Sequence, residues 1–311
     1  MHQEFGFDEI QSVEFCVSVE EGDEHENYLV PTDQSVQEAL RAMLTATVDQ
    51  LENPGETALA DAAWQPFELS EKYATKERLV AALATEEMST IHDLYREEGW
   101  SSNPHALQNP RDIAYYFAVF RDVVHRKLLG VRRATQFKGV LKSRLIRLID
   151  DSLTMVGDNI FRLDNEFDFL ITEGHAYILH PVGFERIAEI EELVSERARA
   201  KTRALEQRLS FVDFTSLAEF VAHHKRAARL VVALSSRMGL EQIEKSLFTA
   251  AARETDVMVV AVGSKISPAA GSEIAFLELI DDRRYTTAIR AGPKEAYIAS
   301  SRRPLRPPAT S

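Results

Sequence analysis

The sequence contains a single cysteine, Cys16, among its 311 residues. One thiol excludes an intrachain disulfide framework and a cysteine-based zinc site. Cys16 lies in the alternating segment VEFCVSVE, which favours a strand with a buried structural thiol over a nucleophile, because no base flanks it. This cysteine usage fits a reducing compartment, and we expect a cytoplasmic protein.

Long apolar runs are also missing. A membrane-spanning helix needs about 18 consecutive apolar residues, and the best runs, at residues 230–234 and 257–262, are far shorter. The opening MHQEFGFDEIQ lacks the basic start and apolar stretch of a secretory signal. We therefore expect neither export nor direct insertion into a membrane.

Glycine and proline are scarce, at 13 and 11 residues, while 45% of the residues are hydrophobic. This composition excludes a fibrous or mainly disordered chain. Single cores usually stop growing at about 250 residues, so the length predicts one large domain or two modest ones.

The first third is expected to form two short strands and then a helix. Residues 13–19 alternate apolar and polar, and YLVPTD follows an acidic stretch, which is typical of a hairpin. Asp33 or Ser35 is placed to cap the helix, and Asn53-Pro54-Gly55 ends it. The apolar positions with helical spacing are Val36, Leu40, Met43, Leu44, Thr47, Val48 and Leu51.

After residue 110 the patterns become those of β-structure. IAYYFAVFRDV and RKLLGVRRATQ are rich in aromatic and β-branched residues. Three short strands are expected within residues 157–187, with Glu173-Gly174 as a tight turn between the last two, whereas residues 137–150 fit either a helix or a strand. The sequence predicts an α+β fold with a mixed or mainly antiparallel central sheet flanked by helices.

The remainder is expected to be mainly helical. A long amphipathic helix over residues 183–209 follows the β-meander, and further helices are predicted at 216–236 and 240–254. VMVVAVG, at 257–263, is typical of a buried strand, and residues 275–289 and 294–300 are expected to complete the central sheet.

Turn-forming residues and a change in charge suggest a boundary near residue 105. GWSSNPHALQNP spans 99–110. Residues 1–100 carry 5 basic and 23 acidic side chains, whereas residues 101–150 carry 10 basic and 3 acidic ones. We therefore predict an acidic α/β region over 1–105, an α+β domain over 106–305 and a disordered tail over 306–311.

A dense group of cations, between Arg121 and Arg147, is the strongest candidate for a site. Nine basic residues stand there against Asp122 alone. Cations at this density can neutralise phosphates and release counterions, which is the basis of sequence-independent binding to DNA or RNA. The predicted DNA contacts are Arg126, Lys127, Arg132, Arg133, Lys138, Lys142 and Arg144.

Two alternatives stay open. The cations could instead pair with the acidic first third, within one chain or across a dimer, and so hold an oligomeric scaffold together. A metal-dependent nuclease would need carboxylates that converge on Mg²⁺. The candidates for it precede Glu173 and are Asp150, Asp151, Asp158, Asp164, Glu166 and Asp168.

No complete catalytic, metal-binding or nucleotide-binding motif is present. Gly263-Ser264-Lys265 follows an apolar run but does not match the spacing of a phosphate-binding loop. The adjacent His223 and His224 would diverge by about 100° on a helix, so they cannot chelate one ion. We therefore expect a binding subunit without a cofactor rather than an enzyme.

The meander and the helix after it, IFRLDNEFDFLITEGHAYILHPVGFERI, resemble the signature region of the family that contains KwaB, the soluble subunit of the Kiwa anti-phage defence system. The pattern combines the strand residues Phe167, Asp168 and Phe169, a tight turn, Tyr177-Ile178, and Phe184-Glu185 at the start of a helix. YYFAVFRD and RKLLGVRRATQFKGVL are similar in placement, and the resemblance covers residues 110–300.

The resemblance implies an antiviral defence effector in the cytoplasm that is recruited to the inner membrane by a small membrane protein, KwaA, and that acts by binding phage DNA. It carries over no catalytic residues. We also expect a homo-oligomer formed through the helix at 183–209, because its charged C-terminal half suggests an interface segment.

Overall fold

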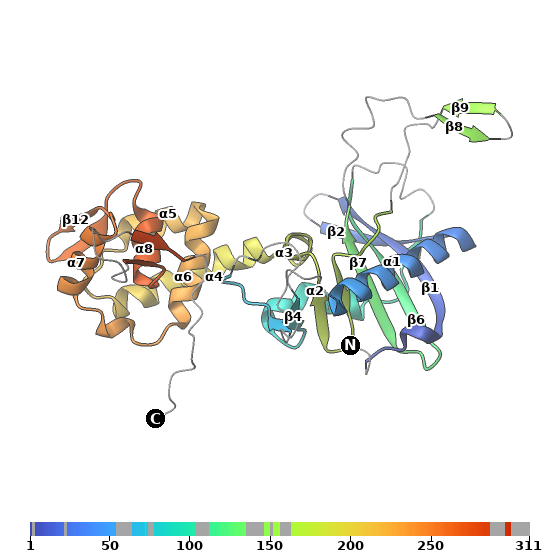
Figure 1. The fold of residues 1–311 in the computed structure, drawn as a ribbon, viewed down its shortest axis with the longest axis horizontal. Coiled ribbons are helices and arrows are strands. Elements are labelled where there is room, and N and C mark those ends of the chain that lie inside the picture. The colour runs from blue at the N-terminus through green and yellow to red at the C-terminus, as the bar shows by residue number, and fades with distance from the viewer. Residues whose placement is uncertain are drawn as a thin grey trace. The chain divides into compact units, whose positions relative to one another are not determined.

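The chain folds into two compact units (Figure 1). Unit 1 contains Met1–Phe67 and Tyr73–Glu189, and unit 2 contains Glu68–Lys72 and Ile190–Ser311. The computed structural model describes residues 1, 4–21, 24–53, 64–71, 73, 78–103, 112–134, 146–149, 152–155, 163–286 and 296–299. The boundary expected near residue 105 lies within unit 1.

Unit 1 is built on a nine-stranded open sheet in the order β3-β4-β11-β10-β7-β6-β1-β2-β5. Its strands are β1 (Ile10–Glu21), β2 (Glu24–Val30), β3 (Gln65–Pro66), β4 (Leu79–Ala82), β5 (Ser101–Ser102), β6 (Ile113–Asp122), β7 (Lys127–Arg133), β10 (Phe169–Ile171) and β11 (His175–Ile178). Only the edge pairs β2–β5 and β3–β4 are parallel among the described strands. The predicted α+β fold with a mixed sheet is confirmed.

The sheet's longest ladder, between β1 and β6, joins the acidic first third to the middle of the chain. β1 pairs with β2 and, on its other side, with β6, where Phe15 lies opposite Ala118. β6 is buried along nearly its whole length because it is central in the sheet. Cys16 is fully buried in β1, and burial raises the pKa of its thiol, so the prediction of a structural thiol is confirmed.

Helix α1 (Gln34–Glu52) covers one face of this sheet (Figure 1). The carboxylate of Asp33 accepts a hydrogen bond from the Val36 N–H at 2.9 Å and so caps the helix. The predicted apolar register is buried at Leu40, Met43, Leu44, Thr47, Val48 and Leu51. The apolar side chains among them pack with those of β1, β6 and β10 in the main core of the unit.

Two shorter helices, α2 (Ser89–Arg96) and α3 (Pro181–Ile187), contact the opposite face. Leu170 joins the core under α1, whereas the neighbouring Phe169 packs edge-on against Phe184 of α3, with ring centroids 5.0 Å apart. The Tyr95 hydroxyl of α2 donates to the Lys127 carbonyl at 3.1 Å. Successive residues of a strand thus pack on opposite faces of the sheet, Leu170 on the side of α1 and Phe169 on the side of α3.

The rest of unit 1 consists of short elements. Two 3-10 turns, η1 (Phe7–Glu9) and η2 (Glu86–Met88), precede β1 and α2. β8 (Ile146–Ile149) and β9 (Ser152–Met155) form a separate antiparallel ribbon. The sequence fitted either a helix or a strand over residues 137–150, and the last part of this range contains the strand β8. Residues 135–145 are outside the described part of the chain.

Unit 2 is mainly helical. Its elements are α4 (Ile190–Arg208), α5 (Thr215–His223), α6 (Lys225–Ser236), η3 (Leu240–Gln242), α7 (Lys245–Glu254), β12 (Val259–Val262), β13 (Lys265–Pro268), α8 (Glu273–Ile280), β14 (Arg284–Thr286) and β15 (Ala296–Ile298). α4 packs against α5 and α6 and buries an apolar face that includes Val194, Ala198 and Leu205.

Four expectations for this part of the chain need correction. The single helix predicted over 216–236 is divided at His224 into α5 and α6. The single helix over 183–209 is divided into α3 and α4, because Glu189 adopts a left-handed conformation with φ 53°. Residues 273–280 form a helix, and β14 and β15 pair with each other instead of completing the central sheet. VMVVAVG contains β12, which is largely exposed rather than buried.

Candidate nucleic-acid interface

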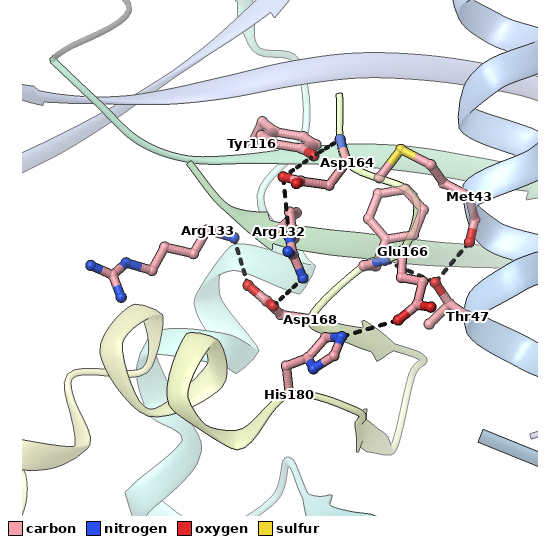
Figure 2. Close-up of polar contacts among 10 residues, drawn as sticks. Met43, Thr47, Tyr116, Arg132, Arg133, Asp164, Glu166, Asp168 and His180 are labelled. Atoms are coloured by element: carbon pink, nitrogen blue, oxygen red, sulfur yellow. Dashed lines mark hydrogen bonds and ion pairs between the residues drawn. The ribbon is translucent and has the colours of Figure 1, made fainter. Parts of the chain in front are cut away.

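Arg132 lies at the centre of a polar network at the end of β7 (Figure 2). Its Nη1 donates to Oδ1 of Asp168 at 2.7 Å, and its Nε donates to Oδ2 of Asp164 at 3.3 Å. The side chain is only 19% exposed, and that of Asp168 is 5% exposed. One guanidinium group is thus held between two carboxylates.

Asp168 makes a second contact to the same strand, because its Oδ2 accepts the Arg133 backbone N–H at 2.7 Å. Burial raises the pKa of Asp168 above its ordinary value, although Arg132 and this N–H favour the ionised form. Gly183 of α3 lies so close that a Cβ built there would be 2.2 Å from Oδ2. Strand β7, the residue before β10 and helix α3 therefore meet at one carboxylate.

Three more contacts fix the segment that leads into β10. The Tyr116 hydroxyl accepts the Asp164 N–H at 3.0 Å. The Thr47 hydroxyl accepts the Phe167 N–H at 2.8 Å and donates to the Met43 carbonyl of α1 at 2.7 Å. His180 Nε2 lies 3.1 Å from Glu166 Oε2, as Figure 2 shows.

Two other predicted DNA contacts also have partners within the chain. Lys127 is 8% exposed, and its Nζ lies 3.3 Å from Glu98 Oε1 and 4.8 Å from the centre of the Tyr95 ring. Arg126 Nε donates to Asp122 Oδ2 at 2.7 Å. Asp122 is buried, yet its pKa is lowered because hydrogen bonds from Arg126 and the Gly6 N–H outweigh the effect of burial.

Arg133 differs from these cations. Its neighbour Arg132 faces the network, and alternation along β7 directs Arg133 to the other side. In Figure 2 its guanidinium points away from the network. No hydrogen bond or ion pair joins that guanidinium to a residue in the described part of the chain.

The other three predicted contacts, Lys138, Lys142 and Arg144, lie outside the described residues. They belong to the stretch from residue 133 to residue 147, which contains five cations and no acidic residue. Of the five cations in this stretch, Arg133 is the one whose side chain the structure describes. The structure brings Arg126, Lys127 and Arg132 to three separate internal carboxylate partners rather than to one shared surface.

The carboxylates considered for a metal site divide in a similar way. Asp150, Asp151 and Asp158 are outside the described residues. Asp164 and Asp168 both contact Arg132, and Glu166 contacts His180. Within the described residues, no group of three or more histidine, cysteine or acidic side chains could hold a metal ion.

Comparison with protein-family models gives one match, to the family described as Kiwa protein KwaB-like, over residues 115–290. The matched range covers more than half of the chain and runs from β6 to β14. The chain belongs to the KwaB-like family. No curated protein matches the sequence. No solved structure matches it either.

Membership of the KwaB-like family gives the chain a role in Kiwa anti-phage defence. The family match includes Arg126, Lys127, Arg132, Arg133 and the stretch that follows them, and it lies within the predicted domain at 106–305. In the described part of the chain, no helix is long and apolar enough to cross a membrane.

Sequence analysis missed a polar cluster around Glu4, a residue that precedes the range matched by the KwaB-like family model. Glu4 Oε2 accepts hydrogen bonds from the Tyr177 hydroxyl at 2.7 Å and the Thr172 hydroxyl at 2.8 Å, and Oε1 lies 2.9 Å from His175 Nδ1. Burial disfavours the charge on Glu4, but these hydrogen bonds prevail and lower its pKa. No sequence signal connects residue 4 with residues 172–177, because only the folded sheet brings them together.

Proposed function

We propose that this chain is the DNA-binding effector subunit of a Kiwa system and binds double-stranded DNA with little sequence preference. The observation that carries the proposal is the charge of the stretch that starts at Arg133. Its five cations have no acidic neighbour in sequence, and the Arg133 guanidinium has no partner among the described residues. Arg133 is therefore available to a phosphate, and phosphate contacts supply most sequence-independent affinity.

The internal ion pairs refine which of the seven predicted residues contact DNA. Arg132 is largely buried, and breaking its pair for a phosphate would leave the buried Asp168 without this cation. Lys127 is only 8% exposed and lies against Glu98 and the Tyr95 ring. We therefore assign the DNA contacts to Arg133, Lys138, Lys142 and Arg144. Arg126, which is 43% exposed beside Asp122, precedes β7 at the end opposite to Arg133 and is not assigned to this surface.

The acidic first third limits how DNA can approach. Residues 1–100 have a large excess of acidic side chains, and a phosphate backbone beside them would be repelled. DNA is therefore expected on the side of unit 1 to which Arg133 points. The acidic surface is left for a basic partner.

That partner, in this proposal, is a KwaA-like membrane protein that recruits the chain to the inner face of the membrane. The family's place in the Kiwa system supports the existence of partner proteins. Co-expression with a KwaA-like membrane protein, followed by detergent extraction and purification through the membrane subunit, tests this part. Absence of the chain from the purified complex would contradict it.

Binding is tested by titrating fluorescent double-stranded DNA with the full chain at several salt concentrations. The logarithm of affinity is expected to fall linearly with the logarithm of salt, and each phosphate that the protein neutralises contributes about 0.9 to the slope. The triple variant Arg133→Glu, Lys138→Glu, Lys142→Glu is therefore expected to bind far more weakly and to reduce the slope by about three.

A matched control carries three charge reversals elsewhere, at the exposed residues Arg96, Arg186 and Arg253. Both triple variants change the net charge equally, so weaker binding by the first alone localises the DNA surface. Equal weakening in both would mean that only net charge matters and would reject the assigned surface. Repeating the titration with Mg²⁺ and analysing the DNA on a gel separates the alternatives, because cleavage indicates a nuclease and absence of binding leaves a scaffold.

A further inference from the structure

The β12–β13 hairpin of unit 2 exposes an uncharged apolar strand. Val260 and Val262 of β12 are 46% and 44% exposed and lie on one face of the strand, and Met258, just before the strand, is 59% exposed and continues their alternation. No charged residue occurs between Asp256 and Lys265. In a chain with 27% charged residues, such a strand is unusual for a surface that meets only water.

The backbone of β12 also presents an open edge. In an antiparallel ladder, hydrogen-bonded and non-hydrogen-bonded pairs alternate. Val259 lies opposite Pro268, which has no N–H, so this pair is of the non-hydrogen-bonded type. Val259 and Ala261 therefore direct their N–H and C=O groups away from β13. Within the described residues, no strand pairs with this edge.

We propose that the β12 edge binds β12 of a second copy of this chain, antiparallel, across a two-fold axis that passes beside Val260. A two-fold axis perpendicular to the sheet keeps each residue on the same face in both copies, so Val260 lies opposite itself and Met258 lies opposite Val262. Val259 and Ala261 then form hydrogen-bonded pairs with each other across the axis. One contact between the two copies thus supplies hydrogen-bond partners for the open β12 edge of each copy.

The charges at the two ends of the strand favour a copy of the same chain. In this register Asp256 is level with the partner's Ser264, the residue before Lys265 at the start of the partner's β13, so opposite charges approach at both ends. Lys265 also lies 3.2 Å from Glu206 within its own chain, and Asp256 is exposed. The middle of the strand is uncharged, so a self-pair brings no like charges into contact.

This surface is distinct from the one that sequence analysis favoured for oligomers. The apolar face of α4 is buried against α5 and α6 inside unit 2, which leaves its charged face outward. The β12 contact is short, so we expect a reversible dimer whose population depends on concentration. It does not depend on the DNA binding proposed above.

Disulfide trapping tests the pairing and its register. Cys16 is the chain's single cysteine and is fully buried, so Val260→Cys adds one accessible thiol. Directly opposite residues in a non-hydrogen-bonded pair have Cα atoms about 4.5 Å apart, within the range of a disulfide. Mild oxidation of the full-length Val260→Cys variant is expected to yield a covalent dimer.

The matched control is Val262→Cys. In the proposed register the two Val262 residues are offset by four positions along the strands, about 13 Å, which is too far for a disulfide. The control is therefore expected to stay monomeric under the same conditions. Equal cross-linking of the two variants would indicate random collision and overturn the proposal, as would no cross-linking of either.

Sedimentation of the full chain supplies a second test without oxidation. Val260→Lys and Val260→Glu each place like charges opposite each other on the axis, so each variant alone is expected to sediment with the mass of one chain. A mixture of the two is expected to regain the mass of two chains, and Val260→Thr, which stays uncharged, is expected to behave as the wild type. A wild type that is monomeric at every concentration, or charged variants that dimerise like it, would refute the β12 contact.

Discussion

Arg132 and Asp168 form a nearly buried ion pair with 2.7 Å between Nη1 and Oδ1, and Asp164 approaches the same guanidinium. These two residues belonged to rival hypotheses, a cation for DNA and a carboxylate for a metal. In the folded chain each neutralises the other. We therefore expect the contact between Arg132 and Asp168 to contribute to the free energy of unfolding of unit 1, which denaturation experiments measure.

Arg132→Met is expected to lower the free energy of unfolding by about 3–5 kcal/mol, because Asp168 and Asp164 would lose their shared cation. Urea denaturation measures the change. The defect is expected to shrink as pH falls, since the buried Asp168, whose pKa is already raised, takes up a proton and no longer needs a counter-ion.

The double variant Arg132→Met, Asp168→Asn provides the control for that experiment. Removing both charges is expected to cost less than removing the cation alone, because one fewer unpaired charge stays buried. A double variant as unstable as the sum of both single variants would show that the two side chains do not interact.

Gly183→Ala is expected to destabilise unit 1 because the added Cβ would lie 2.2 Å from Asp168 Oδ2. Gly130→Ala is expected to do the same against the Phe167 ring, at 2.7 Å, and overpacking of this kind typically costs about 1–3 kcal/mol. Gly174→Ala is the control, since its nearest neighbour would be Glu4 Oε1 at 3.9 Å. Thermal unfolding of the three variants should separate the first two from the third.

Glu4→Gln is expected to lower stability by roughly 1–3 kcal/mol at neutral pH, because the hydrogen bonds from Tyr177, Thr172 and His175 lose a charged acceptor. The folded-state pKa of Glu4 is lowered, so this contribution is fully present above the ordinary carboxyl pKa and disappears as pH falls through the folded value. Unfolding free energies of both proteins should therefore converge in acid. A difference that is constant with pH would contradict this account.

Thr47→Val keeps the shape of the side chain but leaves the buried Phe167 N–H without its acceptor. We expect stability to fall by about 1–3 kcal/mol in denaturant unfolding. Thr202→Val is the matched control, because the hydroxyl of this buried threonine only donates to the Ala198 carbonyl of its own helix. Similar decreases in both variants would mean that the hydrogen bond between α1 and Phe167 contributes little.

Local features of the fold could be predicted from the sequence. The Asp33 cap, the apolar register of α1 and the turn at Glu173-Gly174 each depend on residues close together in the chain, and all three are confirmed. The family resemblance, carried by the segment around Phe167 and Tyr177, is confirmed by the match over 115–290.

Features that depend on distant contacts could not be predicted. The pairing of Arg132 with Asp168 requires β7 and β10 to be neighbours, with Val131 opposite Phe169. An apolar run such as VMVVAVG fits a buried strand as well as an exposed edge strand, because periodicity does not report what covers it. The left-handed Glu189, which ends α3, has no glycine or asparagine to mark it.

The pairing of β1 with β6 also has a consequence for synthesis of the protein. The two strands begin about 100 residues apart, so at roughly 5–20 residues per second the ribosome needs on the order of 5–20 seconds to deliver the second after the first. During that interval β1 can pair with β2, but the other edge of β1, which includes Phe15 and Val17, stays unpaired until β6 has been made. Newly made chains should therefore depend on chaperones most while residues 22–122 are being translated.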